Sequence, residues 1–306
     1  MKKKYGKKAL INILTLLIVM LTIYSDLIAQ DAQTKHNSNI GITNEMFNDV
    51  NIRDAKVIID LWAKMIHERF ITSLQTSTFI YKNIDDMIKD INSEKVDYLF
   101  LNVPQYLMHK SSLKIEPYYG TLLNKKKSFD LLFIGKKEIT LKSFNDLRNS
   151  TIVVQGGRYK TLSELFLDYL CLSNGITKKE NFFKKIIFEE NASKTILGTF
   201  FGKNDFSIIT SSTFDIMSEM NPQIKKTLKI MYKRKNLVND LFCFRSTLAQ
   251  KYKDLAINFG NNIDSNPKTS QVYKIFKIDG SYEINNSDLE QTLELWEDYN
   301  KLKNQK

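Results

Sequence analysis

Two eight-residue segments, 95–102 and 203–210, follow one pattern and constrain the fold more than any other feature of the chain. Both read Lys-x-Asp-aromatic-x-apolar-apolar-polar, and each lies between a short amphipathic helix pattern and a new helix start. An apolar run that ends in a polar residue is typical of a buried strand in a parallel sheet. The same match in the same order of elements predicts two similar α/β lobes whose strand ends face a common crevice.

The third position of each segment is an aspartate, Asp97 in the first and Asp205 in the second. Two such carboxylates could form an acid pair for general acid–base chemistry. Their repeated place just before a strand instead favours a structural role.

The first lobe is predicted from strands at 39–43 and 79–81, a helix over 54–70 and a second helix capped by Asn83. This β-α-β-α-β order implies a parallel sheet with helices on its faces. Two ridges of apolar residues on the long helix should pack on the sheet: Val57, Leu61 and Met65, and Ile58, Trp62 and Ile66.

Ligands of such sheets bind beyond the carboxyl ends of the strands. In the first lobe this place follows segment 95–102, where Pro104 lies in the first turn of a new helix. The candidate ligand-binding residues there are Asn102, Gln105 and Tyr106. Tyr106 would shield the ligand, or would be an aromatic residue of the lobe surface.

Residues 151–175 read as a strand, a glycine turn and a helix. Residues 151–154 are β-branched, Gly156 and Gly157 let the backbone turn sharply, and apolar residues recur at helical spacing over 160–173. Such a unit points free backbone N–H groups and the positive helix end at whatever lies above it. We therefore predict a small-anion site. Its candidate residues are Gly157, Arg158, Tyr159, Lys160 and Thr161.

Each of these side chains also has a plainer interpretation. Arg158 would be the main ion partner of the ligand, or an exposed arginine of the turn. Tyr159 would shield the ligand, or would lie on the lobe surface. Ser211, with its neighbours Thr210 and Ser212, could donate hydroxyls to the ligand or cap the helix that follows.

The rest of the chain predicts an inserted second domain. Too little strand pattern remains after Leu241 for a third lobe, so the tail should pack on an earlier one. We expect a discontinuous lobe 1 over residues 36–130 and 236–306, and an inserted lobe 2 over residues 131–235. The two crossings between them, near 130–136 and 233–240, would act as a hinge.

The first 29 residues have the pattern of a signal peptide. Five lysines precede an apolar run over residues 9–24, and a polar segment follows Ala29. The alternative is an uncleaved membrane anchor, although the run is short for a membrane span. We expect a periplasmic or extracellular protein. The net charge of +11 favours anionic partners or membrane surfaces, and nucleic acid is not expected outside the cell.

The reactive residue types form no recognisable catalytic or metal site. Cys171 and Cys243 read as buried thiols, although an oxidising compartment would allow a disulfide. The 3 histidines are scattered, so no metal site is expected. No nucleophile–base pair or phosphate-loop signature appears, so we expect neither an enzyme nor a cofactor.

Several segments together resemble the solute-binding proteins of phosphate, phosphite and phosphonate ABC importers, which have the type II periplasmic binding fold. The resemblance covers roughly residues 38 to 300. Two segments match short family motifs: residues 96–106 are similar to "vDla.lgp..Y", and residues 143–148 are similar to "sl.DLkGk". The helix over 54–70, the 151–175 unit and the region of Tyr282, Trp296 and Tyr299 also suit the family.

The resemblance implies that helix N-termini and hydroxyls capture an oxyanion between the two lobes. The matching positions are Gln105 and Tyr106 on one lobe and residues 157–161 on the other. Two departures stand out. The family's second-lobe turn is usually rich in serine and threonine, whereas residues 155–160 read Gln-Gly-Gly-Arg-Tyr-Lys. Many members place a histidine in the stretch that corresponds to 188–191, where this chain has none.

We therefore expect an α/β protein of two doubly wound lobes with a ligand cleft between them, similar to type II periplasmic binding proteins. It would be a monomer that captures a small anionic ligand, phosphonate- or phosphate-like, for the permease of an ABC importer. The alternative is a ligand-sensing or interaction protein of the same fold without transport, whose partner would be a sensor kinase. Neighbouring genes for a permease or for a kinase would separate the two.

Overall fold

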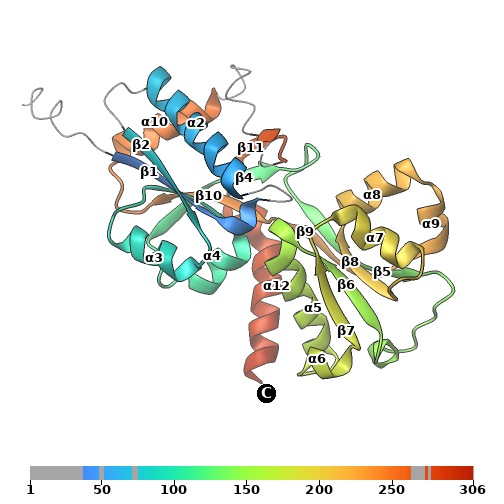
Figure 1. Cartoon of the computed structure of the whole chain (residues 1–306). Coiled ribbons are helices and arrows are strands. Elements are labelled where there is room, and N and C mark those ends of the chain that lie inside the picture. Colours follow the sequence, from blue (N-terminus) through green and yellow to red (C-terminus); the bar gives the residue numbers. More distant parts are fainter. Residues whose placement is uncertain (1–36, 48–51, 71–74, 263–272, 275–276, 306) are drawn as a thin grey trace, which may run out of the picture.

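The chain folds into two α/β lobes that lie side by side, each built on one sheet (Figure 1). The computed structural model describes residues 37–47, 52–70, 75–262, 273–274 and 277–305. The predicted signal segment 1–29 lies outside them. We call lobe 1 the part built on the six-stranded sheet and lobe 2 the part built on the five-stranded sheet.

The sheet of lobe 1 has a parallel half and an antiparallel half. Strand β1 pairs in parallel with β2 and β3, while β10 joins β3 to β4 and β11 extends β4, all antiparallel. The parallel part agrees with the order predicted from the first half of the chain. The strands, in sheet order, are β11 (Gly280–Glu283), β4 (Ile115–Leu122), β10 (Asp240–Arg245), β3 (Tyr98–Asn102), β1 (Asn37–Thr43) and β2 (Gln75–Tyr81).

Helices cover both faces of this sheet. One face buries Ile42 and Phe244 against α2 and α10, and the other buries Leu99 and Leu101 against α3, α4 and the start of α12. Asn83 caps α3 as predicted, because its side chain accepts the N–H of Asp85 at 3.0 Å. The helices are α2 (Ile52–Phe70), α3 (Ile84–Asn92), α4 (Val103–His109), α10 (Gln250–Asn261) and α12 (Asn286–Asn304).

The buried face of α2 differs from the prediction. Ala55, Ile59 and Ala63 are buried, whereas Val57 is 67% exposed and Leu61 56% exposed. The predicted ridge through Val57 and Leu61 is therefore wrong. Small alanines at i and i+8 let the helix approach the sheet closely. The side chains of Met65 and of the second predicted ridge, Ile58, Trp62 and Ile66, lie outside the described residues.

Lobe 2 repeats the parallel core of lobe 1. Strand β6 pairs in parallel with β7 and β8, and β5 joins β8 to β9 antiparallel. Helices α5 and α6 cover one face, and α7, α8 and α9 cover the other. The strands are β7 (Lys185–Glu189), β6 (Thr151–Gln155), β8 (Phe206–Thr210), β5 (Phe129–Lys136) and β9 (Leu228–Leu237); the helices are α5 (Lys160–Ser173), α6 (Lys179–Phe182), α7 (Ala192–Phe200), α8 (Ser211–Met220) and α9 (Gln223–Thr227).

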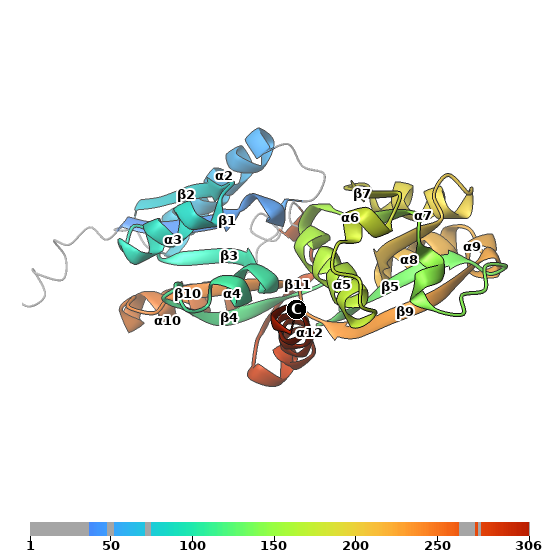
Figure 2. The same ribbon diagram turned by 90° about the horizontal axis from the view of Figure 1, so that it is seen from below.

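Two backbone segments and one helix connect the lobes. The chain leaves lobe 1 after β4 and returns between β9 and β10. Helix α12 lies between the lobes in both views (Figures 1 and 2). Its Leu289 is buried with lobe 1 residues and its Leu295 with lobe 2 residues, and Arg234 of β9 pairs with Glu294 and Asp298.

The tail therefore contacts both lobes, whereas the predicted division assigns residues 236–306 to lobe 1. Burial of one leucine side chain contributes roughly 1.5–3 kcal/mol, so Leu289 and Leu295 fasten α12 to both cores. The other predicted domain boundaries, and the hinge motion, stay predictions. Within the residues that the structure describes, none of the helices is both long and apolar enough to span a membrane.

Candidate functional site

The carboxyl ends of β1 and β6 meet where the lobes touch, and each is the central strand of the three parallel strands in its lobe. In lobe 1, β1 ends in the one-turn 3-10 helix η1 (Asn44–Met46), and in lobe 2, β6 ends in the 3-10 helix η3 (Gly157–Tyr159). The two turns contact each other. Gly157 has a φ of 60°, a left-handed conformation that favours glycine, so the glycine turn is needed to bring η3 to this junction.

On the lobe 1 side, Asn102 and Gln105 form the predicted helix start. Asn102 Oδ1 accepts the N–H of Gln105 at 2.8 Å, and Gln105 Oε1 accepts the N–H of Asn102 at 3.4 Å, so the pair forms a capping box for α4. Asn102 is 1% exposed. Its amide Nδ2 donates to Glu45 Oε2 at 2.8 Å, which directs the Glu45 carboxylate to the junction.

The same carboxylate oxygen crosses to lobe 2. Thr161, in the first turn of α5, donates its hydroxyl to Glu45 Oε2 at 2.5 Å. The positive end of a helix favours a negative group at this place. The N-terminus of α5, where the sequence predicts an anion, therefore holds a carboxylate that belongs to the chain itself.

Arg158 is buried between the lobes rather than exposed. Its side chain is 1% exposed, and its Nη2 lies 3.1 Å from Oδ2 of Asp240, which is fully buried at the start of β10. Asp240 also accepts the Thr121 hydroxyl at 2.9 Å and the Asn239 amide at 2.7 Å. The interpretation of Arg158 as an exposed turn arginine is wrong, and its role as the ion partner of a ligand stays a prediction.

Tyr159 and Lys160 point to different surroundings. Tyr159 is buried in the core of lobe 2 with its ring 5.2 Å from that of Phe129, edge to face, so it is not a residue of the lobe surface. Burial raises the pKa of the Tyr159 hydroxyl to about 12. Lys160 is exposed at the start of α5, and its Nζ lies 5.4 Å from the centre of the Phe188 ring.

The hydroxyls after β8 are engaged within lobe 2. Thr210 caps α8, because its Oγ1 accepts the N–H of Thr213 at 3.2 Å. Ser211 Oγ accepts the N–H of Asp130 at 3.1 Å. The capping interpretation of this segment is confirmed for Thr210, while ligand binding by Ser211 stays a prediction.

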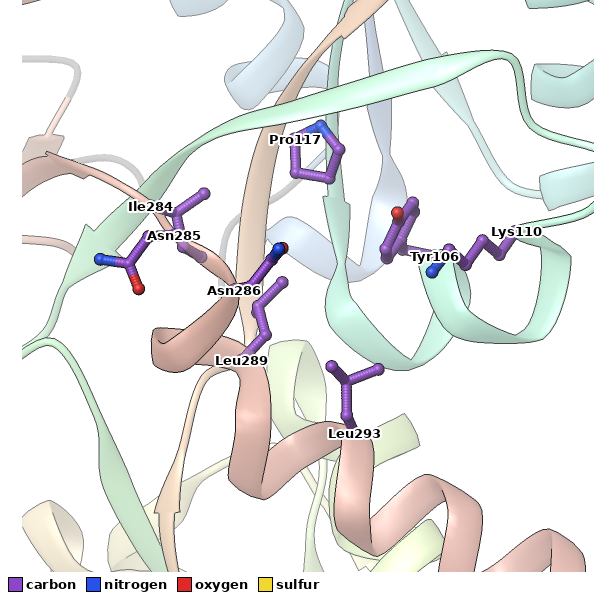
Figure 3. A pocket seen from close by; sticks show the side chains of 8 residues that line it. All are labelled: Tyr106, Lys110, Pro117, Ile284, Asn285, Asn286, Leu289 and Leu293. Atoms are coloured by element: carbon purple, nitrogen blue, oxygen red, sulfur yellow. The ribbon is translucent and has the colours of Figure 1, made fainter.

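Tyr106 lines a separate pocket between α4, β4 and the start of α12 (Figure 3). The pocket has a volume of about 120 Å³. Burial raises the pKa of the Tyr106 hydroxyl. Tyr106 therefore lies with α12, while Asn102 lies with Glu45 and Thr161. The residues that line this pocket are Tyr106, Lys110, Pro117, Ile284, Asn285, Asn286, Leu289 and Leu293.

Sequence reasoning missed Glu45 and Asp240, the two carboxylates of the junction. A signal for Glu45 was available, because it lies in the turn just beyond β1, at the same kind of strand end that made Asn102 a candidate. Asp240 is the first residue of an antiparallel strand, so the rule about the carboxyl ends of parallel strands does not apply to it. Only the pairing of β10 with β3, which sets Asp240 opposite Asn102, brings it to the junction.

The described residues contain no group of three or more His, Cys, Asp or Glu side chains that could hold a metal ion. Cys171 and Cys243 are both buried free thiols, and burial raises the pKa of the Cys171 thiol to about 12. The disulfide that an oxidising compartment would allow is not formed.

Known proteins of similar structure are binding proteins of the same two-lobe fold. The model of the family described as "ABC transporter, phosphonate, periplasmic substrate-binding protein" matches residues 60–289. A Prochlorococcus marinus protein in complex with methylphosphonate is 14% identical with a TM-score of 0.58, over 88% of this chain and 100% of that one. A binding protein component of an ABC phosphonate transporter from Pseudomonas aeruginosa is 16% identical with a TM-score of 0.59, over 87% of each chain.

A Xanthomonas citri protein bound to ATP is 13% identical with a TM-score of 0.63, over 87% of this chain and 98% of that one. A search of curated proteins by sequence found no match. At these identities the solved structures establish the fold, and the family model, which spans most of the chain, establishes the family. That family consists of substrate-binding proteins and is not an enzyme family. The chain therefore belongs to the periplasmic substrate-binding proteins of phosphonate ABC transporters and is a solute-binding protein of an ABC importer.

Proposed function

We propose that this binding protein captures a small oxyanion, phosphonate- or phosphate-like, at the junction of its two lobes and presents it to the membrane permease of its importer. The ligand would lie on the N-terminus of α5, where backbone N–H groups and the positive helix end favour negative charge. Thr161 would donate its hydroxyl, and Lys160 would supply charge.

One observation carries the proposal. Thr161 already donates to a carboxylate oxygen at 2.5 Å, so this position accepts an oxyanion in a hydrogen-bonding geometry. The methylphosphonate in the Prochlorococcus marinus relative supports the ligand class. Arg158 would bind the ligand only if its guanidinium released Asp240. We therefore assign the initial contact with the ligand to residues 160–161.

Thermal-shift titration of the mature chain, beginning after Ala29, tests the ligand. Phosphate, phosphite, methylphosphonate, alkylsulfonates and acetate would each be titrated, and a true ligand raises the melting temperature with concentration. We expect methylphosphonate or phosphate to do so, and Thr161→Val to weaken the binding about tenfold, which corresponds to one charged hydrogen bond. If no anion shifts the melting temperature, the anionic ligand is wrong.

Lys160→Ala measures the contribution of charge. Lys203→Ala is a matched control, because Lys203 is also an exposed lysine of lobe 2. A fall in anion affinity with Lys160→Ala and none with Lys203→Ala would support a local role. Equal affinities in the two variants would assign the charge effect to the whole surface.

The remaining parts of the proposal concern the state of the protein in the cell. We propose a monomer that is secreted by its first 29 residues. Mass spectrometry of the exported protein would give the position of cleavage, and light scattering with and without ligand would give its mass. An uncleaved N-terminus in the membrane fraction would support the anchor instead.

A further inference from the structure

The two lobes contribute opposite groups to their junction. Lobe 1 supplies the carboxylates of two polar contacts, Glu45 and Asp240. Lobe 2 supplies the partners, which are the Thr161 hydroxyl on the α5 N-terminus and the Arg158 guanidinium. The surface of lobe 2 that would take an anion is thus covered by negative groups of lobe 1.

The two carboxylates differ in how firmly they are held. Asp240 is fully buried, and both of its oxygens have partners: Oδ2 contacts Arg158 and Thr121, and Oδ1 accepts from Asn239. Glu45 is partly exposed, and a single oxygen, Oε2, accepts from both Asn102 and Thr161. A group in contact with water can leave its site without an uncompensated buried charge, so Glu45 is the carboxylate that a ligand could replace.

We propose that Glu45 is a specificity-determining residue that acts as an internal anion. It occupies the N-terminus of α5, holds the lobes together without ligand, and is displaced by an anion that binds there more strongly. The inference rests on the proposed function, because it places the ligand at the same helix end.

The competition selects a class of ligand. At neutral pH, phosphonate and phosphate groups carry between one and two negative charges and at least three acceptor oxygens, whereas a carboxylate carries one charge and two oxygens. A free monocarboxylate has the same charge and the same number of acceptor oxygens as Glu45. Glu45 competes better for the site, because its attachment to the chain gives it a high effective concentration there. Glu45 therefore excludes simple carboxylates and admits tetrahedral oxyanions, which carry more charge and more acceptor oxygens.

Two substitutions at Glu45 test the proposal. Glu45→Gln removes the charge and keeps the shape, and Glu45→Ala removes the contact altogether. Glu219→Gln is the control, because Glu219 is an exposed carboxylate on α8. Calorimetry with methylphosphonate and with acetate measures affinity, and small-angle scattering of the ligand-free proteins measures the separation of the lobes.

We expect Glu45→Ala to increase the radius of gyration without ligand, because the contact between η1 and α5 is lost. We expect both Glu45 variants to bind methylphosphonate about tenfold more tightly than the parent protein, and to gain measurable affinity for acetate. Glu219→Gln should change neither the radius nor the affinities beyond a small effect of net charge.

The outcomes separate this inference from the proposed function. If the parent protein binds methylphosphonate but the Glu45 variants neither expand nor gain affinity for either anion, the internal anion is wrong and the proposed function stands. If Glu45→Ala expands while no variant binds any anion, the internal contact is supported and the anionic ligand is wrong.

Discussion

In lobe 1 strand β1 ends in η1, and in lobe 2 strand β6 ends in η3, yet η1 carries the carboxylate of Glu45 and η3 carries the guanidinium of Arg158. Below the turns the lobes are built alike. Asp97 N–H donates to the Asn39 carbonyl at 2.9 Å and Asp205 N–H donates to the Thr151 carbonyl at 3.1 Å. In return, the Asn39 N–H donates to the Asp97 carboxylate at 3.2 Å and the Thr151 N–H to the Asp205 carboxylate at 2.7 Å.

The likeness follows from the repeated sequence pattern, and the difference follows from residues outside it. The pattern places an aspartate before β3 and before β8, where each ties its strand to the start of the neighbouring central strand. Glu45 and Arg158 come from the turns after the central strands, which share no pattern. The repeat therefore determines the scaffold of both lobes, and the turns determine the charge at the junction.

Arg158→Ala should have the largest effect on stability. It would leave Asp240 as a buried carboxylate without its ion partner, which typically costs 3–5 kcal/mol of the free energy of unfolding. Arg148→Ala is the control, because Arg148 is an exposed arginine of the same lobe whose guanidinium lies 4.8 Å from the centre of the Phe182 ring. It should cost less than about 1 kcal/mol.

Urea unfolding of the two variants gives both values. Combining Arg158→Met with Asp240→Leu should recover most of the loss, because replacing both members of a buried ion pair by apolar residues is often neutral. Equal losses for Arg158→Ala and Arg148→Ala would mean that the ion pair does not join the lobes.

The two repeated aspartates should differ in cost although they make the same backbone bonds. Asp97 is 1% exposed and also pairs with Arg245 at 2.8 Å, whereas Asp205 is exposed. Asp97→Ala should cost about 3 kcal/mol, since it leaves a buried arginine without this partner. Asp205→Ala should cost about 1 kcal/mol, the value of one exposed charged hydrogen bond. Similar losses in thermal unfolding would contradict the assignment of Arg245 as the cause.

The local patterns that recur within a few residues could be predicted from the sequence. The strands 98–102 and 206–210, the Asn83 cap and the structural role of Asp97 and Asp205 depend on neighbours in the chain or on one adjacent strand. The exposure of Val57 and Leu61 on α2 could not be predicted, because the sheet beneath the helix determines which of its side chains are buried. The sheet buries Ala55, Ile59 and Ala63.

The candidate site was predicted only in part, for a reason of distance along the chain. The anion position proposed at the start of α5 rests on one strand–turn–helix unit. Its present occupant, Glu45, is 116 residues away from Thr161, and no local pattern links the two. The same holds for Arg158, because its partner Asp240 belongs to a strand that comes after the strands of lobe 2 in the chain.

The smallest expected effect concerns the last residue of each turn. Met46 and Tyr159 are both buried, but only Tyr159 can ionise, and burial raises its pKa from 10.0 to about 12. Below pH 10 the hydroxyl is protonated in the folded and unfolded states, and its contribution to stability is fully present. As the pH rises from 10 towards 12, the unfolded state loses the proton more readily, so this contribution is lost. At pH 11 the loss is about 1 kcal/mol.

Tyr159→Phe removes the ionisation and, with it, this part of the pH dependence. Denaturant unfolding of both proteins at pH 9 and pH 11 measures the difference, which cancels the titration of the other tyrosines and of the lysines. If the parent protein and the variant lose the same stability between the two pH values, Tyr159 is as accessible to water as the tyrosines of the lobe surface. The two turns would then differ in charge but not in the burial of their last residue.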